Sequence, residues 1–329
     1  MGVQGLTTFI ENNSQIFRDI SFRNSKLVID GCNLYYLLYL KTGLEQNHGG
    51  EYDAFEDLIT KFVKALRDCG IEPYVLLDGG SDCSDIKYNT LMKRAEDRIR
   101  RAQIAAMGGK GNILPTLVEL VLKQTLTNLK VPFAQCFGEA DNQIASLARE
   151  WRCPVLSNDS DFFVFDLPGG FLPISHFKWD AVSQSGRQSY IPCKYYTISC
   201  FCVYFNIKLQ LLPLMAALAG NDYVKLREMG LSIRWPEYIP PGRETTSRFD
   251  GIVRWLKHFQ SPDDALKAVL GLMGGLSRQR EAEVLQALTP SNLPSPVLQR
   301  RHSAGSRTRG GGHSPRLGSS SFDPGPVDL

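Results

Sequence analysis

Aspartate follows three short apolar runs in this chain, directly or within two residues. This pattern constrains the fold more than any other feature of the sequence. Asp30 follows the run 27–29, Asp78 follows the run 75–77, and Asp159 and Asp161 follow the run 155–157. Short runs of apolar, β-branched residues are typical of buried strands, and helical patterns lie between them. We therefore expect βαβ units and a mostly parallel sheet. Because the carboxyl ends of such strands share one edge, the aspartates should gather there.

The same patterns predict the order of elements along the chain. Strands are expected at 26–29, 74–77, 131–135, 155–157 and 171–174. Helices are expected at 53–69, 89–107, 115–128 and 139–151, and after residue 222 at 248–258, 263–272 and 278–288. From residue 290 onward Ser, Gly, Pro and Arg dominate, a composition typical of a disordered tail. The expected fold class is α/β, with a helical region and a tail after the sheet.

Composition and apolar patterning argue against a membrane protein. The stretches Ile198–Phe205 and Leu209–Gly220 are separated by Lys208 and interrupted by Pro213, so neither reaches the length that crosses a bilayer. The first residues lack a basic segment followed by an apolar one, which is the pattern of a secretory signal. We therefore expect an intracellular protein without a membrane span.

The eight cysteines include no Cys-x-x-Cys pair, which indicates reduced thiols. Cys193, Cys200 and Cys202 could be zinc ligands, but their spacing fits no common structural zinc pattern and apolar residues surround them. Buried structural thiols are the favoured interpretation.

The net charge of +3 comes from the tail, because the residues from Ser291 onward hold five arginines and two aspartates. The rest of the chain is neutral, so a nucleic-acid partner requires a local basic patch. The expected helix 89–107 supplies one, with positive charges at Lys93, Arg94, Arg98, Arg100 and Arg101.

Each acid taken alone has a structural explanation. An aspartate after a strand commonly starts a turn or caps the next helix. Glu139 and Asp141 open a helix, where negative charge is favourable whatever the function, and Asp222 could be a turn residue. Several carboxylates on one edge repel each other, however, so we expect a cation among them. A carboxylate set without His or Cys suits Mg²⁺ or Mn²⁺.

A phosphatase-like site is the rival interpretation of Asp159 and Asp161. That chemistry requires a Thr two positions past the second acid, and Phe163 stands there. We therefore set the phosphatase interpretation aside.

Six motifs in order resemble those of the flap-endonuclease superfamily, and most closely its asteroid-type members. The resemblance extends from Met1 to about Tyr223. The motifs are Met1-Gly2-Val3-Gln4-Gly5-Leu6, Val28-Ile29-Asp30-Gly31, Leu76-Leu77-Asp78-Gly79, the acidic helix start from Gly138 to Ala145, Ser157-Asn158-Asp159-Ser160-Asp161 and Gly220-Asn221-Asp222-Tyr223.

The resemblance implies a PIN-like, three-layer α/β/α domain over residues 1–225, a helical extension over 226–289 and a tail over 290–329. It implies a structure-selective DNA endonuclease that cuts near single-strand/double-strand junctions or overhangs and acts in DNA repair in the nucleus. Repair-complex proteins are the implied partners, and a monomer is favoured. The implied ligands of two Mg²⁺ ions, with Mn²⁺ as a substitute, are Asp30, Asp78, Glu139, Asp141, Asp159, Asp161 and Asp222.

The resemblance also implies residues that contact nucleic acid. Lys87 and Arg94 are seven residues apart, which is two turns of a helix, so both could face the scissile phosphate. Tyr36 lies where the family stacks an aromatic ring on a base. The remaining candidates are Gly2, Gln4, Lys93, Arg98 and Arg101. A solvated charged face is the alternative for the basic helix, and core packing is the alternative for Tyr36.

The chain departs from the family pattern in two places. Val224-Lys225-Leu226-Arg227 replaces the usual glycine-bracketed turn that grips duplex DNA, and the stretch from Arg94 to Glu139 is compact. The alternative function is a non-catalytic scaffold in receptor-tyrosine-kinase signalling, such as that of the EGF receptor. The complete acidic set favours the enzyme.

Overall fold

The computed structural model describes residues 3, 5–46, 48–80, 88–109, 111–220, 233, 235, 248–273 and 277–288. The candidate residues Gly2, Gln4, Lys87 and Asp222 lie outside these ranges.

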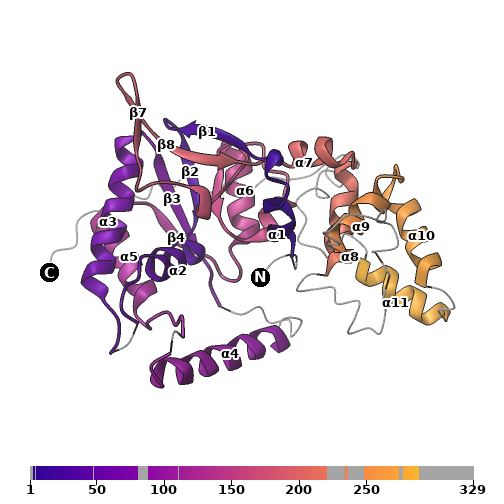
Figure 1. Ribbon diagram of the computed structural model, residues 1–329, viewed down its shortest axis with the longest axis horizontal. Coiled ribbons are helices and arrows are strands. Elements are labelled where there is room, and N and C mark those ends of the chain that lie inside the picture. The colour runs from indigo at the N-terminus through magenta and orange to yellow at the C-terminus, as the bar shows by residue number, and fades with distance from the viewer. Residues whose placement is uncertain are drawn as a thin grey trace, which may run out of the picture. The chain divides into compact units, whose positions relative to one another are not determined.

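A five-stranded parallel sheet forms the centre of the fold (Figure 1). Its strand order is β4-β3-β2-β5-β6, and every neighbouring pair is parallel. The strands are β2 (Lys26–Asp30), β3 (Glu72–Leu77), β4 (Phe133–Gln135), β5 (Val155–Ser157) and β6 (Phe171–Pro173). The chain runs outward from β2 through β3 to β4, then returns to the other side of β2 with β5. The boundary between β2 and β5 is therefore a topological switch point, where α/β sheets bind ligands.

Two hydrophobic clusters cover the two faces of this sheet. On one face, Leu27 and Ile29 pack with buried residues of α2 (Gly31–Lys41), α3 (Tyr52–Asp68) and α5 (Val118–Asn128). Val28 points to the opposite face, because side chains alternate along a strand. There it joins buried residues of α1 (Leu6–Glu11), α6 (Asp141–Trp151) and α8 (Leu212–Ala219). The predicted three-layer α/β/α fold is confirmed.

A small antiparallel sheet, which the sequence patterns did not predict, extends the fold. Its order is β1-β8-β7, with β1 (Arg18–Phe22), β7 (Ser183–Ser185) and β8 (Gln188–Tyr195). Polar residues interrupt the apolar ones along these strands, and most of their residues are exposed or half-buried, so they lack the apolar runs that marked the strands of the central sheet.

The remaining elements are helical. The basic helix predicted at 89–107 is α4 (Tyr88–Ala106), and the helices predicted after residue 222 are α9 (Arg248–Leu256), α10 (Pro262–Met273) and α11 (Arg278–Leu288). The other helix is α7 (Ile198–Phe205), and the short 3₁₀ turns are Ser14–Ile16, Ser160–Phe163, Ile174–His176 and Leu209–Leu211.

Among the described residues, no single helix combines the length and the apolar composition needed to span a bilayer. The segments Ile198–Phe205 and Leu209–Ala219 satisfy both conditions only when taken together, and a 97° bend separates them. Every residue of α8 is buried.

The boundaries predicted near residues 225 and 289 lie outside the residues that the structure describes, so the predicted three-part division stays a prediction.

Two glycines allow the ends of neighbouring strands to approach closely. A Cβ atom added at Gly31 would lie 2.9 Å from the carbonyl oxygen of Leu76, and one added at Gly79 would lie 1.8 Å from that of Cys136. The backbone N–H of Gly79 also donates to the carbonyl oxygen of Gly138 at 2.8 Å. The Asp-Gly pairs at these strand ends therefore have a packing reason for their glycines.

We predict that Gly79→Ala destabilises the protein by about 1–3 kcal/mol, because backbone atoms must move to admit the methyl group. Gly80→Ala is the matched control, since its added Cβ would meet no heavy atom closer than 3.9 Å. Urea denaturation of both variants measures the difference. Equal stability of the two variants would contradict the close approach at Gly79.

Candidate active site

Asp30 is held in one orientation at the end of β2. It caps α2, and its two carboxylate oxygens accept hydrogen bonds from the backbone N–H and the side-chain amide of Asn33, at 3.0 and 2.6 Å. The side chain is 5% exposed. Burial raises its pKa to about 6, although these hydrogen bonds act in the opposite direction.

Ser157, at the end of β5, connects Asp30 to the next pair of acids. Its hydroxyl donates to Asp30 Oδ2 at 2.7 Å and accepts from the backbone N–H of Asp159 at 3.0 Å. Asp159 in turn accepts from the backbone N–H of Asp161 at 3.1 Å, which caps the 3₁₀ turn Ser160–Phe163. The ends of β2 and β5 are thus joined at the switch point of the sheet.

Asp78 connects the end of β3 to the start of α6. Its Oδ1 accepts a hydrogen bond of 2.8 Å from the backbone N–H of Ala140, the residue between Glu139 and Asp141. Asp78 and Glu139 are exposed, whereas Asp141 is half-buried. One carboxylate therefore positions the chain segment that carries two others.

Asp141 lies at the centre of the acidic group. Burial raises its pKa to about 8, and the negative charges of four other acids contribute in the same direction: Asp159, Asp161, Asp30 and Glu139. Asp78 belongs to the same group, because its charge and that of Asp141 both act on the Cys136 thiol, whose pKa is raised mainly by burial. The six described carboxylates of the predicted set therefore gather at one edge of the sheet.

This donor set fits a divalent cation chemically. It offers only carboxylate oxygens, which Mg²⁺ and Mn²⁺ prefer, and the pKa of Asp141 is raised first by burial and then by the neighbouring negative charges. In the described ranges, however, no three His, Cys, Asp or Glu side chains stand as the ligand shell of one ion. The ligand roles stay a prediction.

The predicted nucleic-acid contacts lie on α2 and α4. Tyr36 is 46% exposed, so the core-packing alternative is wrong. A hydrogen bond with Tyr36 raises the pKa of Arg101, which also forms an ion pair of 2.7 Å with Asp97. Arg100 pairs with the same aspartate. Part of the charge on α4 is therefore compensated within the helix, as the solvated-face alternative expects.

The other described candidates on α4 differ in exposure. Lys93 and Arg98 are exposed, and Arg94 is half-buried. Their contact with nucleic acid stays a prediction.

Sequence reasoning missed several residues of the site. Ser157 and Asn33 orient Asp30, but a serine or an asparagine after a strand is too common to attract notice. Phe137 is fully exposed beside Glu139, on the loop whose carbonyl oxygen accepts from the N–H of Gly80 at 3.0 Å. Its exposure could have been found only from the structure, because an aromatic residue in the sequence is more often buried than exposed.

We predict that the metal-free protein loses stability as the pH rises. Asp30 and Asp141 have folded-state pKa values of about 6 and about 8, above the ordinary value of 3.8. The folded state therefore binds more protons than the unfolded chain between pH 4 and pH 8, and its advantage declines across that window. Thermal unfolding in EDTA should show a falling midpoint from pH 5 to pH 8.

Asp141→Asn should flatten this dependence and raise the midpoint at pH 8 by a few degrees, where about 1 kcal/mol corresponds to ~2–4 °C. Asp180→Asn, at an exposed aspartate outside the acidic group, is the control and should leave the slope unchanged. Identical slopes for wild type and Asp141→Asn would show that neither burial nor the neighbouring charges raise the pKa of Asp141.

Comparison with known proteins places the chain in a family. Residues 1–101 match the model of the XPG N-terminal domain, and residues 90–227 match a model described as XPG domain containing. The Danio rerio protein named single-strand DNA endonuclease ASTE1 is 44% identical over 82% of this chain. Protein asteroid of Drosophila melanogaster is 29% identical over 68% of it.

The chain spans 39% and 32% of the length of these two relatives. A solved structure of the catalytic core of Rad2 in complex with a DNA substrate covers 88% of this chain and is itself covered completely, with 15% identity and a TM-score of 0.48. At that level of likeness, the fold assignment rests on the strand order and the two core clusters described above. On its matched sequence, the chain belongs to the asteroid family of XPG-type proteins.

Proposed function

We propose that the chain is a divalent-metal-dependent, structure-selective DNA endonuclease. The observation that carries the proposal is the gathering of six carboxylates, Asp141 among them, with Asp30, Asp78 and Asp159 oriented by hydrogen bonds. A scaffold protein has no need of such a costly concentration of negative charge. Several relatives are named single-strand DNA endonuclease, which supports the same activity.

The acids would hold two Mg²⁺ ions, with Mn²⁺ as a substitute, and Asp222 would complete the set. Bound divalent ions supply an activated water and neutralise charge on the attacked phosphate and on the leaving oxygen. The chain's own contribution is positioning. Ser157 and Asn33 fix Asp30, while the contact of Asp78 with Ala140 fixes the acidic start of α6. Arg94, with Lys87, would hold the scissile phosphate.

The proposed substrate is DNA with a single-strand/double-strand junction or an overhang. Because charges before the tail balance, recognition would rely on the local basic surface of α4 and on backbone contacts. The exposed ring of Tyr36, with Arg101 against its hydroxyl, is available to stack on a base.

A direct assay tests the proposal. Labelled flap, overhang and hairpin DNA is incubated with the chain in Mg²⁺, in Mn²⁺ and in EDTA. We expect cutting with either ion and none in EDTA. Asp159→Ala and Asp161→Ala should each lower the rate by roughly a hundredfold or more, since metal-held charge stabilisation contributes several kcal/mol to catalysis. Asp180→Ala is the control. Cutting that survives both substitutions removes the proposal.

The proposal extends to a nuclear location, because a DNA substrate requires access to the genome. It also extends to repair-complex partners and to a monomeric state. Fractionation of cells that express the tagged chain measures the location, and the native mass of the recovered chain measures the oligomeric state. Recovery in the nuclear fraction is expected. Recovery in the cytosol alone would contradict this extension and leave the proposed chemistry intact.

A further inference from the structure

Phe137, on the loop between β4 and α6, is the most exposed large apolar residue in the described part of the chain. Its exposed fraction is 103%, so the fold leaves both faces of the ring open to solvent. Every other phenylalanine that the structure describes is buried or half-buried. Because an apolar ring is more stable out of water, a ligand that covered Phe137 would gain free energy.

The backbone that carries this ring is fixed to the end of β3. The carbonyl oxygen of Phe137 accepts from the backbone N–H of Gly80 at 3.0 Å. The next carbonyl oxygen, that of Gly138, accepts from the N–H of Gly79 at 2.8 Å. A change of loop conformation that buried the ring would break these hydrogen bonds. The fold therefore presents the ring in a defined place.

The residues on either side of Phe137 lie within electrostatic reach of the acidic group. The charge of Asp141 acts on the thiol of Cys136, the residue before Phe137. The charge of Glu139, two residues after Phe137, acts on Asp141 in turn. Two residues of chain span at most about 7 Å, which is about two base steps of a DNA strand. A strand with a phosphate at the acidic edge would therefore pass Phe137 within a few nucleotides.

The surface between the ring and the acids is clear. A Cβ atom added at Gly138 would meet no heavy atom within 4 Å, and the φ angle of this glycine is not positive. Neither packing nor backbone conformation therefore requires a glycine at this position. Glycine also serves where a ligand approaches the backbone closely, and that use fits the open surface here.

A nucleic-acid base suits an open aromatic ring beside a site for phosphate. Aromatic side chains stack on any base, because every base has a π-face. Within a duplex, neighbouring pairs cover both faces, so a side chain can stack only where the strand is unpaired or the duplex ends. A protein that covered the ring would have to leave the acidic edge accessible, whereas one DNA strand can occupy both.

We propose that Phe137 stacks on an unpaired base of the DNA substrate, close to the cleaved phosphate. The inference rests on the proposed function, since it assigns a further binding residue to the same site. The stack holds the strand in register, so the bond presented to the acids lies a constant number of nucleotides from the stacked base. Phe137 thereby fixes which phosphodiester bond is cut.

Three substitutions of one residue separate stacking from plain apolar contact. Phe137→Ala removes the ring, Phe137→Leu keeps an apolar side chain without an aromatic face, and Phe137→Trp keeps an aromatic face. Tyr204→Ala is the control, because Tyr204 is an aromatic residue of α7 outside the acidic group and is 47% exposed. Thermal unfolding establishes that the variants fold, and the variants at Phe137 should match the wild type because the fold does not cover this ring.

Binding of a fluorescent overhang is measured by anisotropy in Ca²⁺, which takes oxygen ligands in flexible geometry. An abasic residue is moved along the unpaired strand. For the wild type, we expect one position where the abasic residue weakens binding by roughly tenfold, the scale of one lost base stack. Phe137→Ala should weaken binding of the intact overhang by a similar factor. It should show no further loss with the abasic residue at that position, because both changes remove the same contact.

The other variants refine this result. Phe137→Leu should behave like Phe137→Ala, whereas Phe137→Trp and Tyr204→Ala should bind like the wild type. Failure of the wild type to bind the overhang would overturn the stack. So would wild-type affinity in Phe137→Ala or in Phe137→Leu, or independent losses from Phe137→Ala and the abasic residue that multiply.

Cleavage of the intact overhang in Mg²⁺ separates this inference from the proposed function. We expect Phe137→Ala to cut at several neighbouring bonds where the wild type cuts at one. Wild-type cutting, with neither binding nor the cut position changed in Phe137→Ala, would overturn the stack and leave the nuclease standing. A shared loss in binding without any cutting would support the stack and overturn the nuclease.

Discussion

The arrangement of the site depends on a balance between repulsion of carboxylates and the hydrogen bonds that hold them. Burial raises the pKa of Asp141 to about 8, and the charges of four other acids add to this effect. Against this, Ser157 joins Asp30 to the turn of Asp159, and the N–H of Ala140 holds Asp78. Parallel strands ending at one edge create the crowding, and short local contacts make it tolerable.

The parallel sheet and its acids could be predicted because they depend on local patterns. Apolar runs such as 155–157 mark buried strands, and the acids that follow them fall at one edge once strand direction is known. Strand order was beyond such reasoning, since the pairing of β2 with β5 joins residues more than a hundred positions apart. The antiparallel strands β1 and β8 escaped for another reason: residues such as Arg18, Asp19 and Lys194 face solvent and give no apolar signal.

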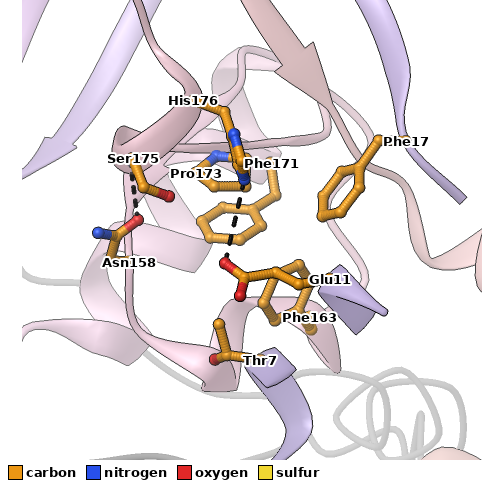
Figure 2. A pocket seen from close by; sticks show the side chains of 9 residues that line it. All are labelled: Thr7, Glu11, Phe17, Asn158, Phe163, Phe171, Pro173, Ser175 and His176. Atoms are coloured by element: carbon orange, nitrogen blue, oxygen red, sulfur yellow. Dashed lines mark hydrogen bonds and ion pairs between the residues drawn. The ribbon is translucent and has the colours of Figure 1, made fainter. Parts of the chain in front are cut away.

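Side-chain partners were the least predictable level of the site. Nothing in the sequence indicates that Tyr36 meets Arg101, or that Asp97 takes part of the charge of the basic helix. The same holds for a small pocket away from the acidic group, which is lined by Glu11 of α1 and by Phe163 and His176 from later turns (Figure 2). These contacts arise only when segments distant in sequence pack together, so the specificity of the site depends on packing more than on its motifs.

The central claim is that divalent cations occupy the space among the carboxylates. Anomalous diffraction from a crystal grown with Mn²⁺ tests it most directly, because manganese is located independently of any assumption about activity. The account predicts strong peaks within about 2–2.5 Å of carboxylate oxygens of Asp30, Asp141 and Asp159. Manganese absent from this edge, or bound only elsewhere on the protein, would contradict the account.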